Sequence, residues 1–245
     1  MSRLSVNVDH VGTLRQTRGE RYPDPAHAAV LVEHAGADGV TAHLRRDRRH
    51  ITDRDLFIIR QVVSTHLTLE MAPIQEMVDI ALQVKPDMVT LVPEKPNEPT
   101  TEKGFDLAVE GPTLESPIEQ LSSAGIIISL FTDPTEENMK AAAALHADYV
   151  ELNTSYYADA KSFEEEVAAV RIIEKAAHLA NKLKLGVAAG HGLHYRNVGN
   201  LAAIEPIEEF SIGHSIISRA VFVGLNQAVK EMIDEIRRYR KSVSA

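Results

Sequence analysis

The chain has 245 residues, of which 44% are hydrophobic and 25% charged, and it contains no cysteine. This composition excludes a disordered chain, and the absence of cysteine excludes a disulfide scaffold, a thiol nucleophile and thiolate metal sites. The formal net charge of −9 argues against nucleic-acid binding, which normally needs an excess of basic residues.

Short β-type runs alternate with segments of helical periodicity along the whole chain. The predicted strands are Leu4–Val8, Gly39–Leu44, Leu67–Met71, Met88–Val92, Ile126–Phe131, Tyr149–Leu152, Leu185–Ala189 and Phe210–Ile212. The predicted helices are 25–36, 55–63, 74–84, 117–125, 135–146, 162–183, 215–223 and 226–240.

Eight strand–helix units in a chain of about 250 residues predict an α/β fold, a (β/α)₈ TIM barrel with additional helices. An open doubly wound sheet is the alternative, but it usually has fewer strands and a glycine-rich first turn, whereas the first turn here reads NVDHVGTL. No linker divides the chain, so we expect residues 1–245 to form one domain. The long irregular stretch Pro93–Phe105 is either a functional lid or an ordinary loop.

No apolar run approaches the roughly 20 residues that span a bilayer, and the N-terminus MSRLSVNVDH lacks the apolar segment of a signal peptide. We therefore expect a cytoplasmic protein with neither a membrane nor a nucleic acid as its partner.

Polar and titratable residues collect where the predicted strands end, which is where barrel enzymes carry out their chemistry. They are Asn7, Asp9, His10, His43, Arg45, His50, Glu70, Glu151, Asn153, His191 and His214. Any one histidine here could be structural, and each buried glutamate could belong to a salt bridge between strands. Their convergence on one rim favours acid–base catalysis, because burial raises the pKa of a carboxyl group toward neutrality.

Two features of the chain predict anion binding. The turns AGHGL and IGHSII follow the last two strands, where barrels often hold a phosphate on backbone N–H groups, although these glycines could simply form tight turns. The segments RQTRGERYPDP and LRRDRRHITD are basic, which indicates either a second anion site or a solvated charged face. Two anion sites would imply two phosphorylated substrates, or one with a phosphate at each end.

The compact metal-ligand spacings are absent, since the chain has no H-E-x-x-H and no His-x-His on the first strand. Asp9 and His10, if both lie on a strand, would face opposite sides. No predicted strand carries an interior lysine for a Schiff base. Acid–base chemistry on phosphorylated small molecules is therefore favoured, and the alternative is a metal-dependent isomerase or aldolase-like barrel that acts on a sugar phosphate.

Seven segments closely resemble the pyridoxine 5′-phosphate synthase family, and the similarity extends from about Leu4 to Met232. They are NVDHVGTLRQTRGERYPDP, GADGVTAHLRRDRRHITDRD, LEMA, LVPEKPNEPTTEKG, ELNTSYYADAK, AGHGLHYRNV and IGHSIISRAV. The resemblance implies a homo-octameric (β/α)₈ barrel without a metal or organic cofactor. It also implies condensation of 1-deoxy-D-xylulose 5-phosphate with 3-amino-2-oxopropyl phosphate, through an imine, to pyridoxine 5′-phosphate, phosphate and water.

The resemblance also implies roles for individual residues. His43 and Glu70 would be general bases, His191 a general acid, and Glu151 would stabilise a transition state. The amino-ketone phosphate would be bound by Asn7, Arg18, Gly192, Gly213 and His214. The deoxyxylulose phosphate would be bound by Asp9, His10, Arg45, His50 and Thr100.

The chain departs from the family pattern at two places. It reads Asn153-Thr154-Ser155 where many members read His-Thr-Gly, and it has Ala188 where asparagine can occur. If the family glycine has a positive φ, Ser155 would change the shape of the loop after the sixth strand.

Overall fold

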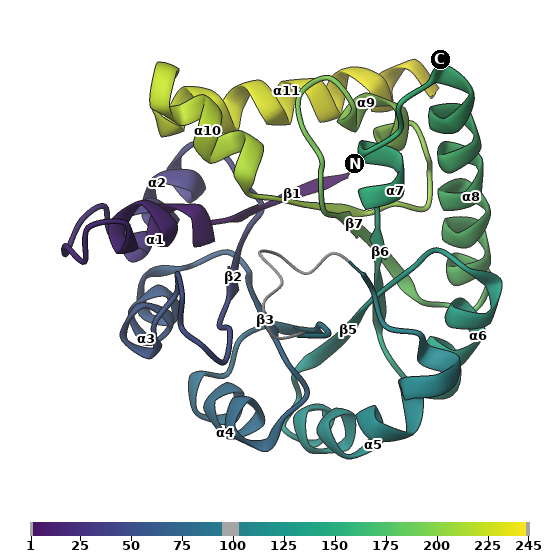
Figure 1. The fold of residues 1–245 in the computed structure, drawn as a ribbon, viewed down its shortest axis with the longest axis horizontal. Coiled ribbons are helices and arrows are strands. Elements are labelled where there is room, and N and C mark those ends of the chain that lie inside the picture. The colour runs from purple at the N-terminus through teal and green to yellow at the C-terminus, as the bar shows by residue number, and fades with distance from the viewer. Residues whose placement is uncertain (1, 95–102, 244–245) are drawn as a thin grey trace.

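The computed structural model describes residues 2–94 and 103–243, with side chains to residue 240. Eight parallel strands pair in sequence order, and β8 pairs with β1 to close a barrel (Figure 1). The strands are β1 (Arg3–Asn7), β2 (Gly39–His43), β3 (Leu67–Met71), β4 (Met88–Leu91), β5 (Ile127–Thr132), β6 (Tyr149–Asn153), β7 (Gly186–Gly190) and β8 (Glu209–Ile212).

Helices surround this barrel on its outside (Figure 1). They are α1 (Asp9–Gln16), α2 (Pro25–His34), α3 (Asp53–Val62), α4 (Gln75–Val84), α5 (Leu107–Ser123), α6 (Glu136–Ala144), α7 (Ser155–Ala158), α8 (Phe163–Lys182), α9 (Val198–Ala202), α10 (His214–Val223) and α11 (Leu225–Val243). The predicted (β/α)₈ barrel with additional helices is confirmed, and each strand end lies within one residue of its prediction. Over the described residues, no helix combines the length and the apolarity needed to cross a membrane.

Several helices differ from the sequence prediction. Helix α1 follows β1 directly, and the predicted helix 117–125 is only the end of α5, which begins at Leu107 and contains two prolines. Helices α7 and α9 were not predicted because each is only four or five residues long. Asp9 and His10 therefore lie in the first turn of a helix, and the expectation that they face opposite sides of a strand is wrong.

The period-two alternation of the strands separates an apolar outer face from a polar interior. In β3, Leu67, Leu69 and Met71 belong to the hydrophobic core between the barrel and its helices. Thr68 and Glu70 lie between them in sequence and so face the barrel axis, where Glu70 lines a cavity. The same alternation brings Asn7, His43, Phe131, Glu151 and Ser211 to that cavity.

A buried ion pair joins helix α1 to helix α3 beside the barrel mouth. Arg15 donates to both carboxylate oxygens of Asp55, at 2.8 and 2.6 Å, and to the carbonyl oxygen of His50 at 2.8 Å. Asp55 also accepts hydrogen bonds from the backbone and hydroxyl of Thr52, the N-cap of α3. Burial alone would raise the pKa of Asp55, but the hydrogen bonds from Arg15 and Thr52 lower it to about 2.

We predict that Arg15→Met lowers the free energy of unfolding by about 3–5 kcal/mol, because the buried Asp55 carboxylate would lose its buried cation and keep only the exposed Arg54 at 3.1 Å. Urea denaturation measures this difference. Arg18→Met is the control, because Arg18 lies in the same segment but is exposed. The double variant Arg15→Met/Asp55→Leu should recover much of the loss, and a single Arg15→Met variant within 1 kcal/mol of wild type contradicts the prediction.

Candidate active site

The carboxyl ends of the strands surround a cavity of about 480 Å³. Twelve of the fourteen predicted site residues line it: Asn7, Asp9, His10, His43, Arg45, His50, Glu70, Glu151, His191, Gly192, Gly213 and His214. Arg18 does not line it and is exposed on the turn after α1, which projects away from the barrel at the purple end of the chain (Figure 1). Thr100 lies outside the described residues.

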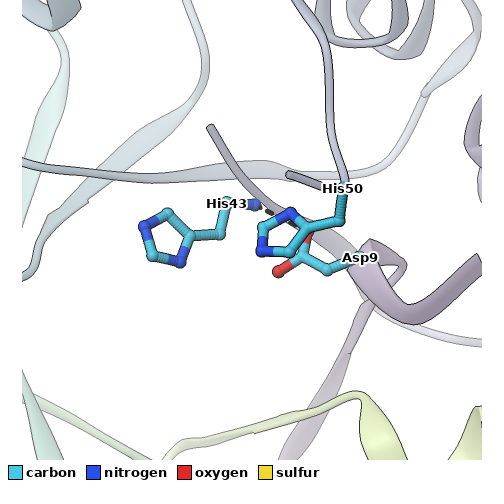
Figure 2. A group of neighbouring side chains, drawn as sticks. All are labelled: Asp9, His43 and His50. Atoms are coloured by element: carbon cyan, nitrogen blue, oxygen red, sulfur yellow. Dashed lines mark hydrogen bonds between the residues drawn. The ribbon is translucent and has the colours of Figure 1, made fainter. Parts of the chain in front are cut away.

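Asp9 holds the first two strand ends together. Its Oδ1 accepts the backbone N–H of His43 at 2.8 Å, and its Oδ2 accepts from the side-chain amide of Asn7 at 2.8 Å. Figure 2 shows that the backbone of His43, rather than its ring, is bonded to Asp9. The ring is left to interact with other groups, and its Nδ1 lies 3.7 Å from Oε2 of Glu70 on the neighbouring strand.

Two buried carboxyl groups in the cavity have strongly raised pKa values. Burial, together with the negative charges of Glu151 and Asp9, raises the pKa of Glu70 well above its ordinary value. Burial and the charge of Glu209 raise the pKa of Glu151 to about 8. Both groups can therefore hold a proton at neutral pH, as groups that donate and accept protons in catalysis must.

The turn after β7 has an unusual backbone. His191 has a φ of 80° and Gly192 a φ of 74°, and a non-glycine residue in this region is strained unless its surroundings hold it there. The Thr154 hydroxyl lies 2.8 Å from the carbonyl oxygen of Gly190 and also contacts that of His191, which fixes the turn. A Cβ at residue 192 would clash with Ala158.

The turn after β8 leads into α10 through Gly213, where an added Cβ would lie 2.9 Å from the Cβ of Asn7. Among the described residues no side chain caps α10, so backbone N–H groups of its first turn are available beside the cavity that His214 and Ser215 line. Helix N-termini of this kind bind anions.

The opposite part of the rim offers donors from side chains. Arg45 is buried, and its Nε has no hydrogen-bond partner among the described residues, with Asp47 at 3.6 Å. His50 Nδ1 accepts the backbone N–H of Ile51 at 3.0 Å, so a neutral ring carries its proton on Nε2. Burial lowers the pKa values of His10 and His50, which favours neutral rings as donors.

Most residues of the predicted basic cluster do not line the cavity. Arg15 is committed to Asp55, and Arg48 pairs with Asp53 and Glu76 at the surface. Arg45 and Arg49 line the cavity, and Arg49 also contacts Asp47 at 2.6 Å. The cluster is therefore partly structural, partly a solvated face and partly available to an anion.

Asp9, His43 and His50 place ligand-type atoms within 4.8 Å of one another, a spacing that would suit a metal ion (Figure 2). However, the lone pair of His50 Nδ1 is used by Ile51, and the proton on Nε2 blocks that nitrogen as a ligand. The trio in this arrangement therefore fits a metal poorly and suits donation to an anion.

Sequence reasoning gave no role to Glu94 or Ser211. Glu94 lies 3.2 Å from the His43 ring, and Ser211 lines the cavity. The inward position of Ser211 on β8 follows from strand alternation, whereas nothing in the local sequence marks Glu94. Ser155, the departure from the family pattern, begins α7 and has no positive φ, so this loop does not require a glycine.

Residues 4–238 match the family model described as pyridoxal phosphate biosynthesis protein PdxJ. A curated pyridoxine 5′-phosphate synthase from Geobacter sp. (strain M21) is 56% identical over 237 residues, which cover 97% of this chain and 99% of the relative. One from Synechococcus sp. (strain JA-2-3B'a(2-13)) is 55% identical over 232 residues, covering 95% and 97%.

Solved structures resemble the chain in fold. Thiamine phosphate pyrophosphorylase from Pyrococcus furiosus has a TM-score of 0.61 at 15% identity, covering 97% of this chain and 96% of that one. Phosphoribosyl anthranilate isomerase from Thermus thermophilus has a TM-score of 0.61 at 12% identity, covering 97% and 100%. At this identity the likeness concerns the barrel alone.

We predict that Glu151→Gln changes how stability depends on pH. The folded-state pKa of Glu151, about 8, exceeds the ordinary value of 4.5, so the native state binds this proton more tightly than the unfolded state. The stabilisation of the native state by this bound proton is fully present below pH 4.5 and is lost as the pH rises to 8. It amounts to at most about 5 kcal/mol. The variant should lack this loss and gain stability relative to wild type between pH 5 and 8.

Urea unfolding at pH 5, 6.5 and 8 measures the effect. Glu174→Gln is the control, because Glu174 is exposed on α8 and its loss should leave the pH dependence unchanged. Parallel pH curves for Glu151→Gln and wild type would contradict the buried, proton-holding state of Glu151.

Proposed function

The chain belongs to the PdxJ family of pyridoxal phosphate biosynthesis proteins, and on this premise we propose how its barrel mouth performs the family's reaction. It is an enzyme, a pyridoxine 5′-phosphate synthase that acts in vitamin B6 biosynthesis. Its substrates are 1-deoxy-D-xylulose 5-phosphate and 3-amino-2-oxopropyl phosphate, and its products are pyridoxine 5′-phosphate, phosphate and water.

The observation that supports these roles most strongly is the meeting of His43, Glu70, Glu151 and His191 on one cavity. The substrate amine attacks the ketone of the sugar phosphate and forms an imine with loss of water. Later steps eliminate the sugar's phosphate, add water and close the ring by an aldol-type condensation. Each step moves a proton beside a nitrogen or a carbonyl carbon. His43 and Glu70 remove protons, His191 returns one, and Glu151 stabilises the charge that develops.

The two substrates carry phosphates that repel each other, so each needs its own binding region. The amino-ketone phosphate binds at the turns after β7 and β8, through Gly192, Gly213 and His214, with Asn7 beside them. The Nε of Arg45, which has no hydrogen-bond partner among the described residues, and the Nε2–H of His50 bind the deoxyxylulose phosphate, together with His10, while Asp9 accepts from its hydroxyl groups. The family resemblance adds Arg18, which does not line this cavity within the described chain, and Thr100, which lies outside the described residues.

Family membership also supports a homo-octamer, and composition supports a cytoplasmic location. Neither a metal nor an organic cofactor is needed for the proton transfers assigned above. Light scattering on the purified chain tests the assembly, and a mass other than about eight times 27.0 kDa would contradict it.

We predict that the purified protein in EDTA converts both substrates into pyridoxine 5′-phosphate and releases phosphate in equal amount. His43→Ala should lower kcat by about 10²–10⁴-fold, the usual contribution of a general base. The fluorescence of the pyridine product and a coupled phosphate assay follow the two products together. His178→Ala is the control, because His178 is exposed on α8.

Each other outcome has a defined meaning. Phosphate release without the pyridine product places a failure after elimination. Turnover that requires a divalent metal favours the metal-dependent sugar-phosphate barrel. Near-normal turnover by His43→Ala removes that residue as the base.

We predict that Arg18→Ala raises the KM for the amino-ketone phosphate by about 10–100-fold, since hydrogen bonds between charged groups contribute about 1.5–3 kcal/mol. The KM for the sugar phosphate should change little. Arg21→Ala is the matched control, an exposed arginine of the same segment. An unchanged KM for both substrates rejects the role of Arg18.

A further inference from the structure

Glu94 reaches from the end of β4 to the ring of His43. Its Oε1 lies 3.2 Å from Nε2 of His43, and its side chain is only 6% exposed. Glu94 does not line the cavity, so it contacts the site through His43 rather than through a substrate. Neither the family resemblance nor the local sequence assigns this carboxylate a role.

Both oxygens of Glu94 act as acceptors. Oε1 faces the His43 ring, and Oε2 accepts the backbone N–H of Arg46 at 3.2 Å. Burial alone would raise the pKa of Glu94, but the hydrogen bond and charge of His43 and the Arg46 N–H lower it below its ordinary value. Glu94 is therefore ionised at neutral pH and cannot donate a hydrogen bond.

An ionised carboxylate determines which nitrogen of the facing imidazole carries the proton. Because Glu94 only accepts, His43 must hold a proton on Nε2. A neutral ring then has its lone pair on Nδ1, which lies 3.7 Å from Oε2 of Glu70. The backbone N–H of His43 is separately bonded to Asp9 (Figure 2). Main chain and ring are therefore each held by a carboxylate, Asp9 and Glu94 respectively.

We propose that Glu94 is a positioning residue that fixes His43 in its Nε2–H form, so that Nδ1 is the atom that accepts the substrate proton. This rests on the proposed function, in which His43 is a general base. When Nδ1 takes a proton from the substrate, the ring becomes an imidazolium whose charge the Glu94 carboxylate stabilises. The same proton then leaves Nδ1 for the substrate or Glu70, and Glu94 stays ionised throughout.

Glu94→Gln separates this role from simple packing. The glutamine has one acceptor oxygen where the structure uses two. If that oxygen bonds to the Arg46 N–H, which can only donate, the amide NH₂ faces Nε2 and requires a lone pair there. The His43 proton then moves to Nδ1, and the base is lost although the shape of the side chain is nearly unchanged.

We expect Glu94→Gln to lower kcat by about 10²–10⁴-fold, with both KM values within about threefold of wild type. In ¹⁵N NMR of histidine-labelled protein, the His43 resonances, assigned by their absence in His43→Gln, should change from the Nε2–H to the Nδ1–H pattern. Glu94→Asp keeps two acceptors, so it should keep the Nε2–H pattern and exceed Glu94→Gln in kcat. Glu76→Gln is the matched control, because Glu76 pairs with Arg48 at the rim, 2.6 Å away.

A kcat of Glu94→Gln within threefold of wild type overturns the proposal, and so does a low kcat with an unchanged His43 tautomer. The tautomer is read without turnover, whereas the base role of His43 is tested by His43→Ala. Near-normal turnover of His43→Ala would thus refute the proposed function, even if Glu94 determined the tautomer of the His43 ring. An unchanged His43 tautomer in Glu94→Gln would refute only the positioning role of Glu94.

Discussion

The closed register of eight parallel strands is the constraint on which the rest of this structure depends. Since side chains alternate along each strand, one set of residues must lie under the helices and the other must face the barrel axis. The first set is apolar, as Leu67, Leu69 and Met71 show. The second includes Glu70 and Glu151, whose pKa values are raised by burial and by neighbouring carboxylates, Glu151 and Asp9 for Glu70 and Glu209 for Glu151. The closure of the barrel therefore also buries the two carboxyl groups and so raises their pKa values.

A rim of ion pairs and backbone hydrogen bonds then positions the side chains at the mouth. Arg15 joins α1 to α3 and also holds the carbonyl oxygen of His50, while Asp9 holds the backbone of His43. These contacts use charged groups that look, in the sequence, like candidates for substrate binding. Their cost of burial is offset because each charge meets its partner at close range.

The sequence predicted the strands closely because buried parallel strands are short apolar runs, which few other elements resemble. It missed α1 because Asp9–Gln16 continues from the first strand without a turn residue to separate them. The inward positions of His43 and Glu70 follow from alternation, and the resemblance named them. The pairing of Arg15 with Asp55, 40 residues away, and that of His43 with Glu94 depend on tertiary contacts that no local pattern encodes.

The state of the His43–Glu70 pair follows from the groups on either side of it. Glu94 draws the ring proton to Nε2, and burial beside Glu151 and Asp9 raises the pKa of Glu70, so this carboxyl group takes up a proton more readily than an ordinary glutamate. The pair thus presents a lone pair on Nδ1 of His43, 3.7 Å from Oε2 of a carboxyl group that can take up a proton and release it. It can accept a proton and donate another in the same cycle, as a condensation followed by elimination needs. Two bound phosphates would add negative charge, which raises the pKa of Glu70 further and favours its taking up a proton during turnover.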